Sequence, residues 1–488
     1  HIDVQAEVER EHPGSTELWF QSIAGNDEAN KTFDVSVAKL REYARGRTGR
    51  YGLYFETGQG ADFTNGHAYG CDMVLLESRK YGLARSLSCE VAEVNGGRSW
   101  VHVNDVAGFI GPEVFRSREQ LVRCCLEDLV MGKLHGLTIG LDVCSTLHMD
   151  VTLDDLDWCL EQVAPAMPAY LMALPTKIDP MLGYLTTGFQ DHVRLRDKFG
   201  LKINDAMQRF FEELQVVDAG GRSTEHFGDP VWVYIQYCRR KGDPRSEQEL
   251  RTEAEGQLAE IRKRGVFIAR GYGDKPSDLS PQMAREIRTI YDDAKVCIWE
   301  QWRDDFVRRI PHWVHVQTQS TDRTDYIWHP ESGEKLSADS LQTLRRLRDE
   351  HAGRWQAQIV ISEGLNALAL MDDGNLLPLL EAIRSQASER GLAVAPENLV
   401  VTSGRVRAGY RIGETLFGGL AGERTLIHIV GERPGSGHHT MSVYLTRASG
   451  EQWQSQGFID HNITKVVSGI AITALRPELA ANEVGRLL

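Results

Sequence analysis

The sequence predicts an α/β protein made of a partial (β/α)8 TIM barrel, a helical connector and a doubly wound, Rossmann-like domain. Three observations predict this fold class. In the first 200 residues, short apolar segments that end in polar or glycine residues alternate with amphipathic helices. The same alternation returns after residue 355, and the stretch between is charged and helical. Strands that alternate with helices are typical of parallel sheets whose faces are covered by helices.

The first part is expected to contain about five β/α units. Its strands are predicted at residues 17–25, 51–56, 99–109, 135–144 and 169–175. A closed barrel of this kind has eight strands, so three more β/α units are expected upstream of His1 or on a second chain. An open five-stranded sheet is the alternative that the same pattern allows. The opening residues 1–8 read as the end of a strand.

The clearest helix of this part is expected over residues 117–132. Ser117 and Gln120 have the spacing of a capping box, which satisfies backbone N–H groups at a helix N-terminus. Gly132 is expected to end the helix. Apolar residues recur at helical spacing and predict a buried face. That face comprises Leu121, Cys125, Leu126, Leu129, Val130 and Met131.

The middle of the chain changes composition. Residues 203–240 read as a helix, a loop and an aromatic, strand-like piece, DPVWVYIQYC. Residues 239–310 are charged and rich in arginine, and they predict connector helices with solvated faces.

The last part returns to strands and helices. Strands are predicted at 356–364 and 397–406, with a helix at 375–391 between them, and residues 423–437 are predicted as a strand that enters a Gly/Pro loop. This βαβαβ order predicts a doubly wound sheet whose ligands bind beyond the carboxyl ends of the strands. The resulting domain ranges are 1–237 for the barrel part, 238–310 for the connector and 311–488 for the final α/β domain.

Composition excludes several classes of function. The chain has 488 residues, 41% of them hydrophobic and 25% charged, which is typical of a globular protein. Its 55 basic and 69 acidic residues give a net charge of −14, which argues against nucleic acid as a partner. No apolar run reaches the roughly 18 residues of a membrane span. We therefore expect neither nucleic-acid binding nor membrane insertion.

Cysteine, histidine and glycine patterns predict no metal or nucleotide site. The eight cysteines contain no C-x-x-C pair and mostly lie in apolar runs, as in reduced cytoplasmic proteins. His148 with Asp150, and the pair His438 and His439, lack a third ligand at a defined spacing. The glycine-rich stretch 431–437 follows a strand but lacks the Lys-Ser/Thr of a phosphate-binding loop.

Two carboxylates stand where predicted strands end. Glu56 follows a short apolar strand and precedes a glycine-rich loop, and Asp142 ends a later strand. Carboxylates at the mouth of a barrel can bind an amine, hold a divalent metal or act as acid and base. The alternative is that each carboxylate caps a neighbouring helix. Phe109, between glycines after another strand, either walls a small pocket or packs in the core.

Longer motifs carry a resemblance to a known enzyme family. LYFETGQG, GFIGPE, LEDLVMGKLHGLTIGLDVC and YLMALPTKIDPMLGYLTTGFQD are similar to the large subunit of ethanolamine ammonia-lyase. VISEGLNALA, GRVRAGYRIGE and VGERPG are similar to its small subunit. The chain therefore resembles a fusion of the C-terminal half of the large subunit with the small subunit.

The resemblance implies roles for individual residues. Glu56 matches the glutamate that holds the substrate amine, and Asp142 completes that polar site. Phe109 and Met172 match walls of the substrate pocket. The matched positions that face adenosylcobalamin are Ser22, Phe33, Thr64, Val406, Glu432 and, near the end of the match, His461. No D-x-H-x-x-G motif of histidine-ligated cobalamin occurs, so the implied cofactor mode is base-on.

The implied activity is the conversion of ethanolamine, or a close vicinal amino alcohol, to an aldehyde and ammonia by a radical mechanism. Two alternatives remain open. One is a related radical lyase for a different amino alcohol, and the other is a non-catalytic cobalamin-binding or assembly component. The resemblance also implies a homo-oligomer in the cytoplasm or in a bacterial microcompartment.

Overall fold

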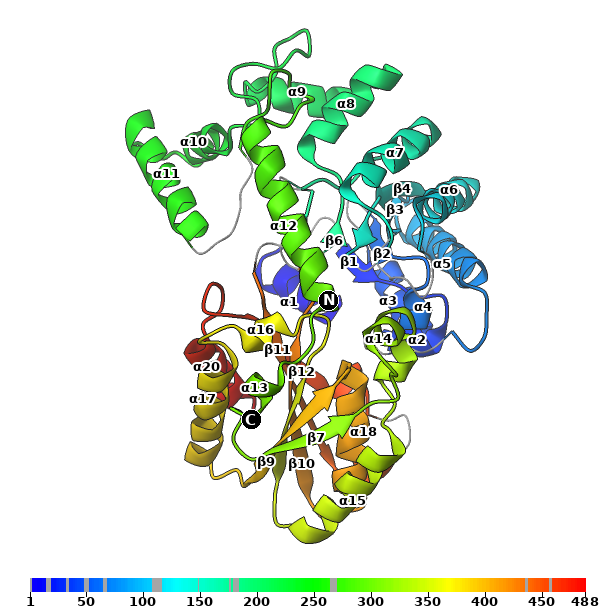
Figure 1. Cartoon of the computed structure of the whole chain (residues 1–488). Coiled ribbons are helices and arrows are strands. Elements are labelled where there is room, and N and C mark those ends of the chain that lie inside the picture. The colour runs from blue at the N-terminus through cyan, green and yellow to red at the C-terminus, as the bar shows by residue number, and fades with distance from the viewer. Residues whose placement is uncertain are drawn as a thin grey trace. The chain divides into compact units, whose positions relative to one another are not determined.

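The computed structural model divides the chain into two compact units (Figure 1). Unit 1 ends at Tyr291, and unit 2 covers Asp292–Leu488. The structure describes residues 2–14, 19–31, 35–47, 52–64, 68–107, 116–147, 149–174, 177–178, 184–263, 270–434, 438–455 and 459–488. Both units combine parallel strands with covering helices, so the α/β prediction is confirmed.

Unit 1 contains a four-stranded parallel sheet whose strands follow one another in chain order. The strands are β1 (Trp19–Ser22), β2 (Leu53–Thr57), β3 (Val101–Val106) and β4 (Thr138–Asp142). Four of the five predicted strands are thus confirmed. In the segment expected to form the fifth strand, the described residues pair in parallel only through single bridges, Leu171 with Leu141 and Leu174 with Gly188. A two-stranded antiparallel ribbon, β5 (Ser145–Thr146) with β6 (Tyr184–Leu185), lies nearby in the chain.

Helices cover one face of this sheet (Figure 1). They are α3 (Val37–Gly46), α5 (Met73–Val94), α6 (Arg118–Leu134) and α7 (Leu153–Val163). The chain also forms α2 (Asp27–Lys31), α4 (Ala61–Thr64) and α8 (Phe189–Phe199). The side chains of Phe55, Val103 and Leu141 alternate toward these helices and are fully buried.

Helix α6 confirms its predicted start and corrects its predicted end. Ser117 and Gln120 form the capping box. The helix continues through Gly132 to Leu134, and Gly136, with φ +70°, follows its end. Gly132 serves close packing instead, since a Cβ there would come within 2.2 Å of the Ile139 side chain.

The predicted buried face of α6 was wrong at one residue. Val130 is 54% exposed, whereas Leu121, Cys125 and Leu129 are buried as expected and Leu126 and Met131 are partly buried. Val130 follows Leu129 directly, so its side chain points about 100° further around the helix.

Two stretches expected to be extended are helical. Residues 2–11 form helix α1 (Ile2–Glu11), not the end of a strand. The DPVWVYIQYC stretch forms α10 (Pro230–Arg240), which begins with an Asp229 cap and a proline in the first turn. Its buried Val231, Ile235 and Cys238 recur at helical spacing and pack on α11 (Glu247–Lys263). Aromatic content suggested a strand, but this burial against a neighbouring helix decides the conformation.

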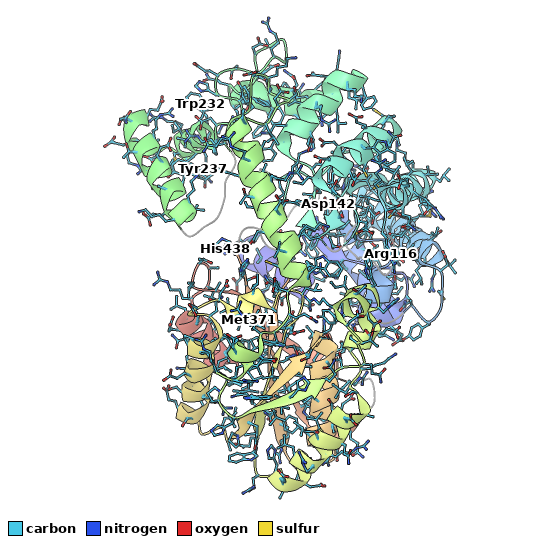
Figure 2. The ribbon with its side chains drawn as sticks, viewed as in Figure 1. Arg116, Asp142, Trp232, Tyr237, Met371 and His438 are labelled. Atoms are coloured by element: carbon cyan, nitrogen blue, oxygen red, sulfur yellow. The ribbon has the colours of Figure 1, made fainter. Side chains whose placement is uncertain are left out.

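Other helices complete the region around α10. They are α9 (Asp205–Glu213) and α12 (Pro281–Trp299), and α11 and α12 confirm the predicted connector helices. Trp232 and Tyr237, labelled in Figure 2, lie on α10. Trp232 donates its Nε1 hydrogen to the Leu214 carbonyl at 2.8 Å and stacks on His226, whereas Tyr237 is 57% exposed.

Unit 2 is built on a six-stranded sheet with the strand order β12-β11-β10-β8-β9-β7. The strands are β7 (Trp313–Gln317), β8 (Ala357–Ser362), β9 (Val394–Thr402), β10 (Glu423–Gly431), β11 (Met441–Ser449) and β12 (Thr464–Ile470). Strands β7 to β10 run parallel, and β11 and β12 add an antiparallel edge. The three predicted strands of this part, β8 to β10, are confirmed.

Helices cover both faces of this sheet (Figure 1). The helices α17 (Leu376–Glu389) and α20 (Pro477–Leu487) pack together on one face, and α15 (Ala338–His351) and α18 (Val406–Phe417) on the other. All six residues of β8 are buried because alternate side chains enter two separate cores. The shorter helices are α13 (Asp304–Val307), α14 (Arg323–Trp328), α16 (Leu368–Met371) and α19 (Gly450–Gln454). Among the described residues, no helix combines the length and the apolar character that crossing a membrane requires.

Candidate active site

The face of the unit 1 sheet opposite the helices carries polar and aromatic side chains. Strand alternation places Tyr54 and Glu56 of β2, His102 and Asn104 of β3, and Asp142 of β4 on this face. The register pairs Tyr54 with His102 and Glu56 with Asn104. A buried sheet face that is polar at its carboxyl end is suited to bind a ligand.

Three rings form an aromatic layer on this face. His102 stacks on Tyr54 at 5.1 Å and on Tyr170 at 4.6 Å between ring centroids. The Tyr54 and Tyr170 hydroxyl groups lie 3.1 Å apart. Gly140 makes room for this layer, since a Cβ there would come within 2.4 Å of the Tyr170 ring. Sequence reasoning missed these residues. The alternation in LYFET and VHVNDV places Tyr54 and His102 on the face opposite the apolar residues, but nothing in the sequence indicates that Tyr170 joins them.

Glu56 lies between two neighbouring strands at the carboxyl end of the sheet. Its register partners are Ser22 of β1 and Asn104 of β3. Burial raises the pKa of Glu56, and the Asn104 amide opposes that increase. Asn104 is fully buried, and its Oδ1 has no hydrogen-bond partner among the described residues. The site therefore offers both a carboxylate and a spare acceptor.

Asp142 ends β4, two strands from Glu56, which corresponds to about 10 Å between strand axes. Asp142 is labelled in Figure 2, is 2% exposed and accepts a hydrogen bond from the Thr186 hydroxyl. The pKa of Tyr170 is raised, first by burial, next by Tyr54, and then by the two carboxylates, Glu56 and Asp142. Both carboxylates thus act electrostatically on the same aromatic layer.

A neutral histidine completes this set. Burial lowers the pKa of His102 to about 4, so its imidazole is uncharged at neutral pH. Its Nε2 has no hydrogen-bond partner among the described residues. The face therefore presents negative charge from its carboxylates beside a neutral imidazole.

The other predicted residues of unit 1 fall in different places. Ser22 lies beside Glu56, and the Met172 backbone N–H donates to the Leu141 carbonyl at the same sheet edge. The Met172 side chain is 38% exposed. Phe33 and Phe109 lie outside the described residues, as does the side chain of Thr64. The structure therefore brings Ser22, Glu56, Asp142 and Met172 together at one edge.

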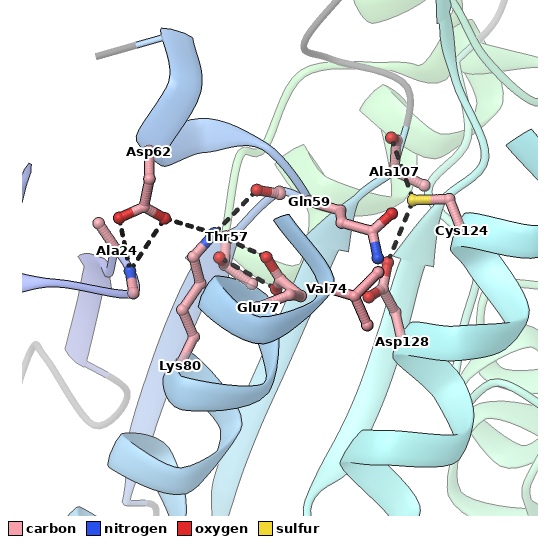
Figure 3. Close-up of polar contacts among 12 residues, drawn as sticks. Ala24, Thr57, Gln59, Asp62, Val74, Glu77, Lys80, Ala107, Cys124 and Asp128 are labelled. Carbon is pink, nitrogen blue, oxygen red and sulfur yellow. Dashed lines mark hydrogen bonds and ion pairs between the residues drawn. The ribbon is translucent and has the colours of Figure 1, made fainter. Parts of the chain in front are cut away.

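A buried ionic network holds the loop that follows Glu56 (Figure 3). Lys80 of α5 donates to the Gly58 carbonyl at 2.9 Å and to Glu77 at 2.6 Å, and it lies 3.5 Å from Asp62. Asp62 in turn accepts hydrogen bonds from the Gly25 backbone and the Asn26 amide. One lysine therefore joins the loops after β1 and β2 to helix α5.

A second buried pair consists of two aspartates, Asp105 of β3 and Asp128 of α6. Burial and the neighbouring Asp128 raise the pKa of Asp105 well above its usual range. Burial also raises the pKa of Asp128 to about 7. With Glu77, these groups could hold a cation, but Lys80 already supplies positive charge there.

In unit 2, two of the predicted residues, Val406 and Glu432, follow the carboxyl ends of parallel strands, and His461 precedes β12. Val406 begins α18 after β9, and Glu432 follows β10 and accepts a hydrogen bond from the Tyr444 hydroxyl at 2.8 Å. The Tyr444 ring lies 6.4 Å from His461, whose Nδ1 lies 2.7 Å from the Tyr410 hydroxyl. Glu432 and His461 are therefore linked through Tyr444.

Fold and site together define an α/β protein with a carboxylate pair at the carboxyl ends of parallel strands, an arrangement typical of enzymes. Comparisons with known proteins specify the family. Residues 1–226 match the family model "Ethanolamine ammonia lyase large subunit (EutB)", and residues 268–488 match "Ethanolamine ammonia-lyase light chain (EutC)". The chain belongs to the ethanolamine ammonia-lyase family, with segments of its large subunit and light chain joined in one polypeptide.

Curated relatives agree with this division. The chain is 37% identical over 238 residues to the ethanolamine ammonia-lyase large subunits of Escherichia coli K12 and Salmonella typhimurium LT2. The E. coli match covers 47% of this chain and 49% of that subunit. A small subunit from Pseudomonas syringae pv. tomato is 34% identical over 136 residues, covering 28% of this chain and 45% of that subunit. The chain thus spans about half the length of the curated relatives it matches.

Proposed function

We propose that this chain is part of an adenosylcobalamin-dependent lyase that converts ethanolamine, or a close vicinal amino alcohol, to an aldehyde and ammonia. One observation carries the proposal. Glu56 and Asp142 share one face and one edge of a parallel sheet within the segment that matches the large subunit. That segment's relatives are ethanolamine ammonia-lyase large subunits.

The electrostatics of this edge suit an ammonium substrate. Glu56 and Asp142 present negative charge, Asn104 offers a hydrogen-bond acceptor, and the adjacent imidazole of His102 is neutral. An ammonium ion placed here keeps its proton, because nearby carboxylates favour the charged form. A protonated amine is the better leaving group, so the two carboxylates both position the substrate and assist loss of ammonia. The aromatic layer of Tyr54, His102 and Tyr170 shields one side from water.

For the fold, we propose that the unit 1 sheet is a segment of a (β/α)8 barrel. Its strands run parallel in chain order with helices on one face, as consecutive barrel units do. The described strands do not close a barrel, and this chain covers about half of its large-subunit relatives. The remaining strands would come from an upstream segment or a separate chain, and a homo-oligomer would place further copies at the sheet edges.

Residues of unit 2 could hold a cobalamin, for which we propose the base-on form because the sequence has no D-x-H-x-x-G motif. Helix α18 begins at Val406 without a side-chain cap, and the positive end of a helix dipole favours amide or phosphate oxygens of a ligand. Glu432 can accept from amide groups, and His461 is half-exposed beside it. Bound adenosylcobalamin would supply the carbon radical that removes hydrogen from the substrate. In the sheet of unit 1, Glu56 and Asp142 would hold the amine throughout.

The coverage of the relatives favours a second candidate, a cobalamin-binding component that turns over only with the rest of the large subunit. For the cell, we propose the cytoplasm or a bacterial microcompartment, since all eight cysteines are free thiols. Ethanolamine remains the proposed substrate over other amino alcohols because the relatives carry its name.

One assay separates these possibilities. The purified chain is mixed with adenosylcobalamin and ethanolamine, and cofactor binding and aldehyde are both measured. Aldehyde supports the lyase, and a panel of substituted amino alcohols then ranks substrates by kcat/KM. Cofactor binding without aldehyde, restored by adding the missing large-subunit segment, supports the second candidate. If the chain neither binds the cofactor nor forms aldehyde, with or without that segment, both candidates are overturned.

A further inference from the structure

Unit 2 contains a cluster of metal-ligating side chains that the proposed lyase does not use. Asp293 and Cys297 lie on the last two turns of α12, and His439 lies just before β11. His439 Nε2 is 3.2 Å from Cys297 Sγ and 3.1 Å from an Asp293 carboxylate oxygen. The same Asp293 oxygen lies 3.9 Å from Cys297 Sγ. Three different ligand atoms thus form one small triangle.

The dimensions of the triangle match tetrahedral zinc. With Zn–S of about 2.3 Å and Zn–N or Zn–O of about 2.1 Å, ligand atoms around tetrahedral zinc lie about 3.4–3.6 Å apart. The three separations here, 3.1, 3.2 and 3.9 Å, bracket that range. Asp293 and Cys297 are four residues apart, which places both on one face of the helix.

A fourth residue orients the histidine. Asp372, which follows α16, lies 2.7 Å from His439 Nδ1. This contact fixes the imidazole ring and leaves Nε2 directed at Asp293 and Cys297. A carboxylate on the far nitrogen is the usual support of a zinc-bound histidine. Figure 2 labels Met371 and His438, the chain neighbours of these two residues, and His438 itself bonds to Thr473 instead.

We propose that Asp293, Cys297 and His439 bind one zinc ion, with Asp372 orienting His439 and a water as the fourth ligand. Thiolate and imidazole ligands favour zinc over magnesium or calcium, which prefer oxygen. Cys297 is buried, while the Asp293 and Asp372 side chains are 43% and 44% exposed, so an ion and a water can enter from the carboxylate side. Binding releases the thiol proton and any proton on His439 Nε2 to solvent.

The site would act as a structural cross-link. The three ligands come from segments separated by 142 and 146 residues in the chain. A bound ion would hold the end of α12 against the segment that enters β11. Sequence spacing could not indicate this site, because Asp293 and Cys297 lie in α12 and His439 follows Cys297 by 142 residues.

The test uses zinc alone and the whole chain. Chelator-treated protein is titrated with Zn²⁺, and we expect one equivalent to bind and the Tm to rise. Cys297→Ser should weaken zinc binding at least a hundredfold, and Asp372→Asn about tenfold. Cys89→Ser and Asp292→Asn are the matched controls, since both residues are exposed and outside the cluster. Wild-type protein that binds no stoichiometric zinc would overturn the proposal and leave His439 as an ion-pair partner of Asp293 and Asp372.

Cobalt gives a second readout in case a variant folds poorly. Co²⁺ in the wild-type site should show a thiolate-to-cobalt band and the intense visible bands of tetrahedral coordination. The thiolate band should vanish in Cys297→Ser and persist in Cys89→Ser. Persistence of that band in Cys297→Ser would place the ion on another cysteine and refute the assignment. Slower alkylation of Cys297 on adding zinc, measured by mass spectrometry of wild-type protein, needs no variant at all.

Discussion

Glu56 and Asp142 end two parallel strands on the same face of one sheet, with Asn104 of the intervening strand between them. Two carboxylates held this way favour a cation, which is why we propose that this site takes an amine.

Glu56→Gln should lower turnover of ethanolamine at least a hundredfold, because the amide keeps the shape but loses the charge that holds the ammonium. Cofactor affinity should stay unchanged. The measurement is steady-state aldehyde formation in the complete enzyme, together with a cobalamin titration. Glu93→Gln, on an exposed part of α5, is the matched control. Turnover near that of the wild type would remove Glu56 from the site.

Gly140→Ala should raise KM about tenfold with a smaller loss of stability. The added Cβ would come within 2.4 Å of the Tyr170 ring, so the ring must move and the aromatic layer with it. Overpacking of this kind costs about 1–3 kcal/mol. Gly82→Ala in α5 is the control, since nothing lies within 4 Å of its Cβ position, and it should be neutral or stabilising. An unchanged KM in Gly140→Ala would mean that Tyr170 does not shape the substrate pocket.

The sequence predicted part of the position of this site and none of its contacts. Glu56 was expected near the carboxyl end of a strand because it follows an apolar run and precedes glycines, and it lies there in β2. Its role as an amine ligand came from the family resemblance and stays a prediction. Tyr54, His102 and Tyr170 were missed because aromatic residues in strands usually signal a core. Only the register shows that they meet on the polar face.

Elsewhere, tertiary packing overrode local pattern. The stretch around Trp232 looked extended because of its aromatic residues, yet burial of Val231 and Ile235 against α11 makes it helical. Gly132 looked like a helix end, yet it is the point where α6 packs on Ile139. The pairing of His439 with Cys297 joins residues 142 apart, and no local pattern encodes such a contact.

Lys80→Met should destabilise unit 1 by about 3–5 kcal/mol, the usual cost of leaving buried charges without their partner. Lys80 is fully buried. Its removal leaves the carboxylates of Glu77 and Asp62 without their cation and the Gly58 carbonyl without its donor. Urea unfolding followed by circular dichroism measures the effect. Lys263→Met is the control, with a side chain that is 71% exposed, and should change stability by less than about 0.5 kcal/mol. A small effect of Lys80→Met would mean that water replaces the lysine.

The buried pair Asp105 and Asp128 predicts that unit 1 loses stability as pH rises from about 4 to about 7. Burial raises the pKa of Asp128 to about 7, whereas an unfolded aspartate titrates near 3.9. Between these values the folded chain binds more protons than the unfolded chain, so the free energy of unfolding falls as pH rises. Each such proton contributes about 1.4 kcal/mol per pH unit.

Asp128→Asn removes this titration, so its stability should depend less on pH than that of the wild type between pH 4 and 7. The comparison is the midpoint of urea unfolding at each pH, with Asp150→Asn as an exposed control. Asp105 also titrates high, because burial and Asp128 raise its pKa, so part of the slope should survive in Asp128→Asn. Parallel stability curves for wild type and Asp128→Asn would show that Asp128 is ionised in the folded chain, with Lys80 compensating its charge.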